Sequence, residues 1–363
     1  MLTASRIKHL DVCVFEALPG IACRPHCAGI ISVNTCRRLG ADYLVDSVYS
    51  EAVIEVGKLE VCLRASKPFA VHIDRLALEK EIARRVEDLG HRILVKHRVV
   101  NAKPSGNLLE LVANSVDGVT RSKCEKVVIA EGFSRALSSR LGLEARRETL
   151  VGAQILVELE SRARCCEIRV KFDEALAPRG FAWVAPLGYG RRALVGIVRE
   201  PPIAKPVEYL LAVAKLFRLS VSRVEKLSGG HVFAGYPKAI SGLGGRVIGI
   251  GDCVAMVKSL SGGGLYAIAR SAPVIARALD EDRPSVLREL RPLLRELRRG
   301  FSLYVALHRV VTRFATMLRR LLKVFVDIGE LDYDRHWEAI LSMMRAFGSD
   351  RVRIRWSPED RSR

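Results

Sequence analysis

Side-chain amides are scarce in this 363-residue chain, which contains one glutamine, Gln154, and four asparagines. Asn and Gln are thermolabile residues that hyperthermophilic proteins use sparingly, so their scarcity indicates a thermophilic source. Long apolar runs are missing too. The most apolar stretch, residues 301–326, carries five cationic side chains, whereas a spanning helix needs about 20 mostly apolar residues. We therefore expect no membrane-crossing helix, and we recognise no secretory signal peptide.

Aromatic residues are also few, at 6% of the chain, and leave little material for surfaces that stack on bases. The net charge of +19 and the isoelectric point near 9.9 nevertheless indicate an anionic partner. We expect a phospholipid surface or a phosphorylated substrate. We expect no nucleic acid, because no nucleic-acid-binding motif is recognisable.

The nine cysteines form neither a disulfide framework nor a metal motif. Their odd number and irregular spacing are typical of reduced thiols in a cytoplasmic protein. Cys23, His26 and Cys27 are close in sequence, but a structural zinc site needs four ligands, and no second pair follows. We therefore expect no metal.

The first segments of the chain are typical of a dinucleotide-binding unit, but the glycine-rich turn of such a unit is not in the sequence. Residues 10–16 (LDVCVFE) are typical of a short buried strand that ends in an acid, and residues 2–9 are typical of a helix. In a dinucleotide-binding βαβ unit, a strand and a G-x-G-x-x-G turn precede such a helix. None precedes Met1, so either the reading frame starts late or the segment has been lost. We favour a late start, because the downstream signals agree with a working fold.

The periodicity of apolar residues organises the rest of the chain. Residues 74–89 are typical of an amphipathic helix, and residues 150–198 alternate with a period of two, which predicts an antiparallel sheet. A further helix is expected at residues 207–217. From residue 283 onward the chain is strongly basic, and we expect it to be helical almost throughout.

A glycine-rich segment, residues 246–272 (RVIGIGDCVAMVKSLSGGGLYAIARSA), has the pattern of a binding site. A buried strand leads into Gly-x-Gly-Asp, and three glycines open a helix of small residues. This layout brings Asp252 and the amides of Gly263, Gly264 and Leu265 to one helix N-terminus, which suits a phosphate or a polarised ring oxygen. The alternative is a strand-to-helix connection that holds no ligand.

Together with segments elsewhere in the chain, this motif resembles the archaeal geranylgeranyl reductase family of the p-hydroxybenzoate hydroxylase-like flavoproteins. Residues 246–272 are similar to the third flavin-binding motif of that family. The other similar segments are DVCVFEALPGIACRPHCAGIIS (11–32), HIDRLALEKEIA (72–83), VVIAEGFSRALSSRLGL (127–143) and APRGFAWVAPLGYGRRALVGI (177–197). They follow the family's order from residue 1 to about residue 278.

The resemblance implies an α/β (α+β) fold with a Rossmann-like FAD-binding domain, an antiparallel substrate-binding sheet and a helical C-terminal part. Its implied divisions are 1–149 for the first part of the FAD-binding domain, 150–230 for the sheet, 231–285 for the second part of the FAD-binding domain, and 286–363 for a basic helical region.

The resemblance also implies FAD as the cofactor and assigns site residues. Glu16 would bind the adenosine ribose, Asp252 the ribityl chain or phosphate, and the amides of Gly264 and Leu265 the isoalloxazine ring. The other positions implied to contact the cofactor are Cys27, Ala28, Ile30, Arg75 and Val99. Those implied to line a prenyl tunnel are Phe181, Trp183 and Pro186. No general acid or nucleophile is evident; Cys27 is a candidate redox thiol, with a packed loop thiol as the alternative.

Several residues differ from the family pattern. In the flavin-facing segments, Ala28 and Ile30 stand where glycine is usual, and Val254 and Ala255 stand where the family has Ala-Gly. Glu131 replaces an aspartate, and Ser259 replaces a proline. In the substrate strand, Phe181 and Ala185 stand for tyrosine and phenylalanine. Added β carbons restrict how closely a ligand approaches the backbone.

By this resemblance, the protein is an FAD-dependent reductase that hydrogenates isoprenoid double bonds of archaeal membrane lipids or their precursors. The expected partners are the prenyl lipid substrate, an anionic membrane surface, and ferredoxin or NAD(P)H as electron donor. The expected location is the cytoplasm, peripheral to the inner face of the cell membrane.

The basic face of a C-terminal helix, with Arg309, Arg313, Arg320 and Lys323 at helical spacing, would contact lipid, and a solvated face is the alternative. Two other functions stay open. One is a flavin monooxygenase or halogenase of the same fold, and the other is a cofactor-free remnant that binds lipid or protein.

Overall fold

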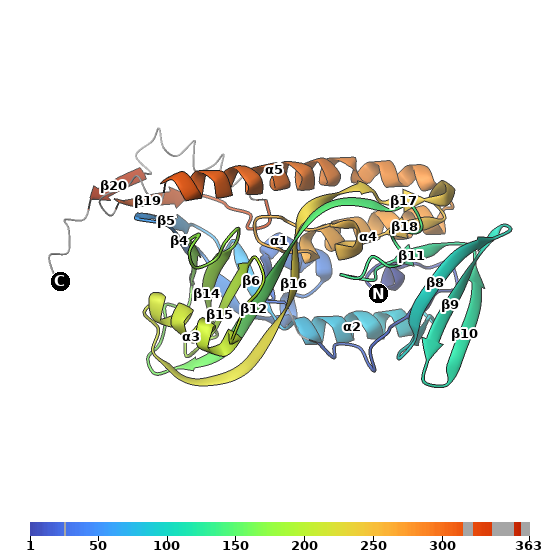
Figure 1. The fold of residues 1–363 in the computed structure, drawn as a ribbon, viewed down its shortest axis with the longest axis horizontal. Coiled ribbons are helices and arrows are strands. Elements are labelled where there is room, and N and C mark those ends of the chain that lie inside the picture. Colours follow the sequence, from blue (N-terminus) through green and yellow to red (C-terminus); the bar gives the residue numbers. More distant parts are fainter. Residues whose placement is uncertain (25–26, 315–321, 336–351, 357–363) are drawn as a thin grey trace. The chain divides into compact units, whose positions relative to one another are not determined.

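The computed structural model describes residues 1–24, 27–314, 322–335 and 352–356. The chain divides into two compact units, each assembled from three separate segments (Figure 1). Unit 1 comprises Met1–Pro25, Arg75–Glu148 and Phe233–Phe301, and unit 2 comprises His26–Asp74, Thr149–Val232 and Ser302–Arg363. Residues 26–74, which the resemblance assigns to the cofactor domain, belong to unit 2.

Short parallel strands form the centre of unit 1. Strand β1 (Cys13–Phe15) pairs with β7 (Arg92–Leu94). Strand β11 (Val127–Ile129) pairs with β18 (Val247–Gly249), which β17 (Ser241–Gly242) joins antiparallel. Among the described residues, β1 has β7 as its sole partner and β11 has β18 as its sole partner. The parallel strands of unit 1 therefore form two separate pieces among the described residues.

Two helices of unit 1 form where the sequence predicts them. Helix α2 (Arg75–Asp88) buries Leu78, Ile82 and Val86, which recur at helical spacing, and exposes its charged residues. Helix α4 (Leu265–Asp280) buries most of its residues and is a core helix of the unit. A separate antiparallel sheet consists of β8 (Arg98–Ser105), β9 (Leu108–Ser115) and β10 (Gly118–Cys124) (Figure 1).

The predicted helix over residues 2–9 is wrong: the structure has a single 3₁₀ turn there, η1 (Ala4–Arg6). The amides of Lys8 and His9 donate to the Asp280 carboxylate at 3.1 and 3.2 Å, so the backbone leaves the helical path. Turn η1 packs against α2 and α4.

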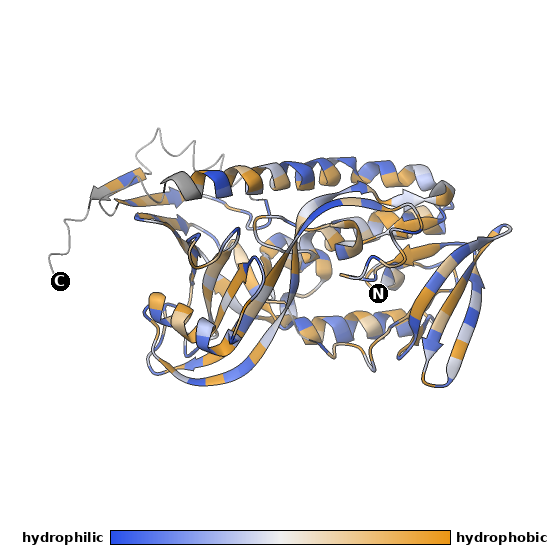
Figure 2. Ribbon diagram, in the orientation of Figure 1, coloured by the Kyte–Doolittle hydropathy of each residue, from blue (hydrophilic) through white to orange (hydrophobic). Residues whose placement is uncertain are grey.

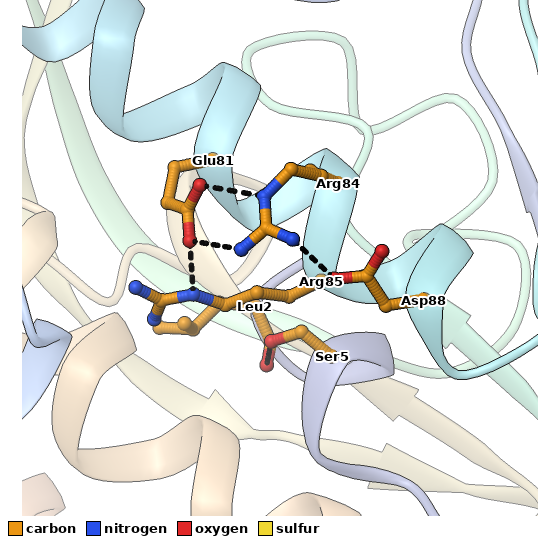
Figure 3. A network of polar contacts seen from close by, with 6 residues as sticks. All are labelled: Leu2, Ser5, Glu81, Arg84, Arg85 and Asp88. Atoms are coloured by element: carbon orange, nitrogen blue, oxygen red, sulfur yellow. Dashed lines mark hydrogen bonds and ion pairs between the residues drawn. The ribbon is translucent and has the colours of Figure 1, made fainter.

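Close to this opening turn, Glu81 of α2 accepts hydrogen bonds from Arg84 and Arg85, and Arg84 also pairs with Asp88 (Figure 3). The two arginine hydrogen bonds lower the pKa of Glu81 to about 2. The network on α2 therefore stays charged well into the acidic range.

Unit 2 is built on a nine-stranded sheet in the order β16-β12-β15-β14-β13-β4-β5-β19-β20. Its strands are β4 (Glu51–Val56), β5 (Leu59–Ala65), β12 (Glu144–Leu159), β13 (Glu167–Phe172), β14 (Phe181–Leu187), β15 (Arg192–Arg199), β16 (Val221–Ala239), β19 (Leu322–Ile328) and β20 (Val352–Trp356). Strands β12, β15, β14 and β13 are antiparallel neighbours, which confirms the prediction for 150–198. Strand β13 pairs in parallel with β4, and β19 in parallel with β5.

Each face of this sheet packs against a different layer. Helix α3 (Pro206–Leu216), predicted at 207–217, covers one face through Leu210 and Val213, which pack on Ile155 and Ile197. The other face packs around Tyr49. On that side lie helix α1 (Val33–Leu39), turn η2 (Asp42–Leu44) and a small sheet of β2 (Ile30–Ser32), β6 (Ala70–Ile73) and β3 (Val45–Tyr49).

The C-terminal region is helical only in part, which corrects the prediction. Helix α5 (Arg291–Phe314) is present, but strands β19 and β20 follow and pair antiparallel. Every second residue of β19, namely Val324, Val326 and Ile328, enters a buried cluster. The segment therefore follows the two-residue period of a strand and not the 3.6-residue period of a helix. Lys323, assigned to a basic helix face, lies in β19 and pairs with Glu60 at 3.0 Å.

Arg320 and the side chain of Arg313 lie outside the described residues, whereas Arg309 is exposed on α5. Within the described ranges, no helix combines the length and the apolar character that crossing a bilayer demands.

Candidate functional site

The glycine-rich segment forms the N-terminal mouth of α4 in unit 1. Strand β18 leads into the 3₁₀ turn η4 (Gly251–Val254), which carries Asp252, and the chain returns to Gly264, the N-cap of α4. A β carbon placed on Gly264 would lie 3.6 Å from Asp252 Oδ1, so the carboxylate and the helix N-terminus are neighbours. Leu265, the first residue of α4, is 8% exposed. The structure therefore brings three of the predicted residues together at one helix N-terminus.

Ser259 anchors the loop in front of this mouth. Its Oγ accepts a hydrogen bond from Gly235 N at 3.0 Å and donates one to Gly235 O at 3.1 Å. Ser259 is 5% exposed, so water does not compete for these bonds. The family has proline here, which restricts a loop through its ring. In this chain a side chain bonded to β16 restricts the loop instead.

A second serine of the same loop carries no such bond. Ser261 Oγ is buried and has no hydrogen-bond partner among the described residues. Leaving a buried hydroxyl unpaired costs about 1–3 kcal/mol. The loop therefore offers a polar ligand an unused donor and acceptor close to Gly263.

Arg147, a residue with no signal in the sequence, adds positive charge beside the mouth. Its guanidinium lies 4.7 Å from the ring centre of Phe233 and 5.7 Å from that of Phe133, and the two rings stack. Burial and then the like charge of Arg135 lower the pKa of Arg147, while Asp252 raises it. Asp252 of the mouth is thus one of the charges near this guanidinium.

Glu131, which stands for the family's aspartate, has a local role in the structure. Its carboxylate accepts hydrogen bonds from Leu137 N at 3.0 Å and Ser138 N at 2.7 Å. These bonds hold the turn that follows β11. The carboxylate is therefore occupied by its own chain.

Glu16 stands at the carboxyl end of β1, as predicted for an acid that binds ribose. Its backbone oxygen accepts a hydrogen bond from His97 N at 2.9 Å, and its Oε1 accepts one from Leu18 N at 2.8 Å. Val99, assigned to the adenine, follows two residues after His97 at the irregular start of β8. The structure thus makes Glu16 and the start of β8 neighbours within unit 1.

Arg75 is the first residue of α2, and its side chain is paired inside the helix. Its Nε and Nη2 both lie 2.9 Å from Glu79 Oε1. The guanidinium expected to touch the cofactor is thus directed along α2.

In unit 2, the only glutamine of the chain holds the turn at residues 27–29. Gln154 of β12 is 8% exposed, and its Nε2 donates to Cys27 O at 3.3 Å and Ser228 Oγ at 3.1 Å. The thiol of Cys27 is exposed and accepts a long contact from Gly29 N at 3.5 Å. A buried amide therefore fixes the backbone of a turn that begins at an exposed residue, Cys27.

Gly29 itself cannot carry a side chain. Its φ is +70°, and a β carbon would lie 2.5 Å from Ile73 O of β6. Ala28 and Ile30 on either side pack against the cluster around Tyr49. Their side chains are part of the core of unit 2, which explains why these positions are not glycine.

The predicted substrate residues lie on both faces of β14. Phe181 and Trp183 are neighbouring rings, 5.6 Å between centres, and Trp183 Nε1 is buried without a hydrogen-bond partner among the described residues. Pro186 alternates with Trp183 and shares the opposite face with Val184, on the side of α3. One tunnel along a single face of β14 therefore cannot be lined by both Trp183 and Pro186.

Two residues of α5 in unit 2 extend the aromatic surface around Phe181. They are Tyr304 and His308, whose ring centres lie 4.7 Å apart. The ring of Phe172 contacts the rings of Phe181 and His308. Burial, followed by the charge of Arg179, lowers the pKa of His308 to about 4. The imidazole is therefore neutral at neutral pH.

The predicted site residues are divided between the units. Unit 1 holds Glu16, Arg75, Val99, Asp252, Gly264 and Leu265, and unit 2 holds Cys27, Ala28, Ile30, Phe181, Trp183 and Pro186. His26 lies outside the described residues. Across the described part of the chain, no three side chains gather in the manner of a metal site.

No family model matches the chain. A menaquinone reductase of Mycobacterium tuberculosis is 27% identical over 227 residues, which cover 57% of this chain and 53% of that protein. Digeranylgeranylglycerophospholipid reductase 2 of Methanothermobacter thermautotrophicus is 25% identical over 287 residues, covering 75% and 72%. A geranylgeranyl bacteriochlorophyll reductase-like structure from Thermoplasma acidophilum superposes with a TM-score of 0.73 at 17% identity, covering 86% and 87%.

These similarities define the class first: the fold is that of FAD-binding Rossmann-type flavoproteins, which flavin-dependent halogenases and a monooxygenase share. The sequence relatives then narrow it. The chain is similar to reductases of the geranylgeranyl reductase family, at 21 to 26% identity. It spans about half the length of the menaquinone reductase it matches.

Proposed function

We propose that the protein is an FAD-dependent reductase that hydrogenates isoprenoid double bonds of a membrane lipid or of its precursor. The observation that carries this proposal is the mouth of α4, where Asp252 stands against Gly264 with Arg147 nearby. Sequence relatives support it, because they include reductases of menaquinone and of digeranylgeranylglycerophospholipid.

The residues at this mouth fit a flavin nucleotide. At Gly264, a β carbon would make only ordinary contacts, 3.6 to 3.9 Å from atoms of Asp252, Met256 and Val257, so Asp252 and the start of α4 can act on one ligand group. The unpaired Ser261 hydroxyl is a further group that a polar ligand would satisfy. Arg147 supplies positive charge for phosphate or for a reduced ring.

When bound, FAD supplies the hydride. Asp252 would accept hydrogen bonds from hydroxyl groups of the ribityl chain, and the amides of Gly264 and Leu265 would donate to the ring. Glu16 accepts hydrogen bonds from the ribose hydroxyls. The turn at Cys27 stays a predicted flavin contact.

For the lipid, the proposal relies on the face of β14 that carries Phe181 and Trp183. Their rings and Phe172 provide apolar surface for a prenyl chain, and the unpaired Trp183 Nε1 offers a donor to a polar group of the lipid. Pro186 has no part in this surface, because it lies on the opposite face.

An anionic membrane surface is the second proposed partner. Helix α5 carries exposed arginines at helical spacing, visible as blue bands in Figure 2. They are Arg291, Arg295, Arg298, Arg299 and Arg309. Near an anionic surface, each cation contributes about 1 kcal/mol. We propose that the enzyme works in the cytoplasm at the inner face of the membrane and receives its electrons from ferredoxin or NAD(P)H.

The test combines flavin binding with lipid saturation. The purified protein is reduced anaerobically with dithionite and supplied with digeranylgeranylglycerophospholipid or menaquinone, and products are followed by mass spectrometry. We expect bound flavin and a product that has gained a pair of hydrogens. Asp252→Asn loses flavin affinity about tenfold or more, because a charged acceptor is removed, whereas the exposed control Asp117→Asn retains it.

The outcomes separate the open alternatives. Oxygen consumption with NAD(P)H and no lipid saturation would favour a monooxygenase. A protein that binds no flavin while folding normally would favour a binding module and contradict the reductase.

A further inference from the structure

A hollow lies in unit 2, on the face of β14 opposite its aromatic residues. It encloses about 250 Å³ between the loop after β12, the start of β13, and the segment that follows α3. Its lining residues are Ser161, Arg162, Ala163, Arg164, Glu167, Arg169, Val184, Pro186, Phe217, Arg218, Leu219 and Ser220. We name it the arginine hollow.

The charge of the arginine hollow is strongly unbalanced, with four arginines against the single carboxylate of Glu167. Arg164 is paired with Glu51 at 2.5 Å, and Arg169 with Glu55 at 2.7 Å. Arg162 and Arg218 have no ion pair with any residue that the structure describes. Two full positive charges at the rim are therefore uncompensated.

The walls that carry these arginines are fixed by the backbone. Glu160 N donates to Ser220 O at 3.0 Å, which ties the loop after β12 to the segment after α3. Arg218 adopts a left-handed conformation, φ +59°, and its amide donates to Lys215 O at 2.9 Å. The arginines thus project from a preformed frame.

Arg169 closes the inner wall. Its guanidinium stacks 5.6 Å from the ring centre of the buried Phe217, and its Nη1 donates to Phe217 O at 3.3 Å. Its Nε is buried and has no hydrogen-bond partner among the described residues. The guanidinium of Arg169 is thus held in the wall by Glu55 and Phe217, with one buried donor unused.

The shape and chemistry of the lining define the ligand. Arginine forks match phosphate oxygens, and two serine hydroxyls add donors. Pro186, Phe217 and Leu219 form an apolar side on which a carbon chain can pack. The volume is below the roughly 300–1,000 Å³ of pockets that hold drug-sized ligands, so the ligand part is small.

We propose that the arginine hollow binds a phosphate ester, either a small organic phosphate or the headgroup of a phospholipid. This site does not depend on the flavin or on the proposed reductase activity. It gives the excess positive charge of the chain a specific use, distinct from a diffuse basic surface.

The experiment measures binding by calorimetry at constant ionic strength. Glycerol phosphate is the soluble probe, and phosphatidylglycerol vesicles, compared with phosphatidylcholine vesicles, are the lipid probe. The test variant is Arg162→Gln/Arg218→Gln. The matched control, Lys123→Gln/Arg140→Gln, removes the same charge from exposed residues of unit 1. Circular dichroism checks that all three proteins fold.

We expect the wild type and the control to bind glycerol phosphate equally, and the test variant to bind about tenfold or more weakly, as for lost charged hydrogen bonds. Weaker binding to phosphatidylglycerol vesicles by the test variant alone identifies a lipid headgroup. An unchanged vesicle affinity identifies a soluble phosphate ester. Equal affinity of all three folded proteins for both probes, or no binding by any, overturns the proposal.

Discussion

Two loops expected to face the flavin, the mouth of α4 in unit 1 and the turn at Cys27 in unit 2, are held by the same device. In each, one side chain bonds to the backbone of another segment. Both side chains are buried, but Ser259 makes two bonds with the backbone of Gly235, whereas Gln154 makes one longer bond to the backbone, at Cys27 O. The first loop is therefore fixed more firmly than the second.

The two loops differ in the opposite order in how strictly the fold requires their glycines. Gly29 has positive φ and a carbonyl oxygen at 2.5 Å from a β carbon, so the fold requires it. Gly264 has φ −88° and only ordinary contacts. Its lack of a side chain has no structural necessity, which is what a position kept open for a ligand should show. The comparison separates residues that the protein needs from residues that its ligand needs.

The largest expected effect comes from replacing each of these two glycines with alanine. Gly29→Ala should destabilise unit 2 by about 3 kcal/mol, because it adds left-handed strain and a backbone clash. Gly264→Ala should change stability by less than about 1 kcal/mol and still weaken flavin binding. Thermal unfolding and flavin titration measure the two effects.

A control variant separates the steric clash at Gly29 from the cost of its left-handed backbone. Gly90 has φ +79° with no atom within 4 Å of a β carbon, so Gly90→Ala has the strain alone, about 1 kcal/mol. If Gly29→Ala and Gly90→Ala destabilise equally, the approach of Ile73 O adds nothing to the cost of the left-handed backbone. If Gly264→Ala leaves flavin affinity intact, the mouth does not hold the ring.

The second effect concerns the serines of the mouth loop. Ser259→Ala should lower stability by about 2 kcal/mol, because it leaves the buried N–H and C=O of Gly235 unpaired. Ser261→Ala is the matched control, since its buried hydroxyl has no partner among the described residues. It should leave thermal stability unchanged or slightly raised, and weaken flavin binding. If Ser261→Ala lowered the stability and Ser259→Ala did not, neither the anchoring role of Ser259 nor the unpaired state of Ser261 would hold.

Much of this could be predicted from the sequence, where local periodicity decides the structure. Helix α2, strands β12 to β15 and the strand–turn–helix around Asp252 have strong patterns, and they form as expected. Strand β19 was missed because its short alternation follows directly on a long amphipathic helix. The parallel pairing of β13 with β4 joins distant segments, and local periodicity cannot specify it.

The side chains around the candidate site were predicted less well. Asp252 and Gly264 are neighbours because a short loop joins them, and the motif encodes that. Arg147 and Gln154 act across strands, so their contacts depend on tertiary structure. Trp183 and Pro186 were assigned to one surface, although strand alternation alone predicts opposite faces. That correction was available from the sequence.

The third effect tests the weaker anchor of the comparison. Gln154→Leu removes the bond to Cys27 O and should cost about 1 kcal/mol. The turn then moves more freely, so Cys27 should react faster with iodoacetamide, measured by peptide mass spectrometry. Cys165, which is also exposed in unit 2, is the internal reference. An unchanged ratio of Cys27 to Cys165 alkylation would show that Gln154 does not hold the turn.

The smallest effect concerns the residue that follows η4. Ala255 has a left-handed backbone, φ +54°, where the family pattern is glycine. A β carbon in that region costs about 1–2 kcal/mol, and the entropy that glycine loses on folding offsets about 0.5–1 kcal/mol. Ala255→Gly should therefore stabilise unit 1 by about 0.5 kcal/mol in thermal unfolding. Because Ala255 is fully buried, a loss of stability would mean that its methyl group contributes more packing energy than the strained backbone costs.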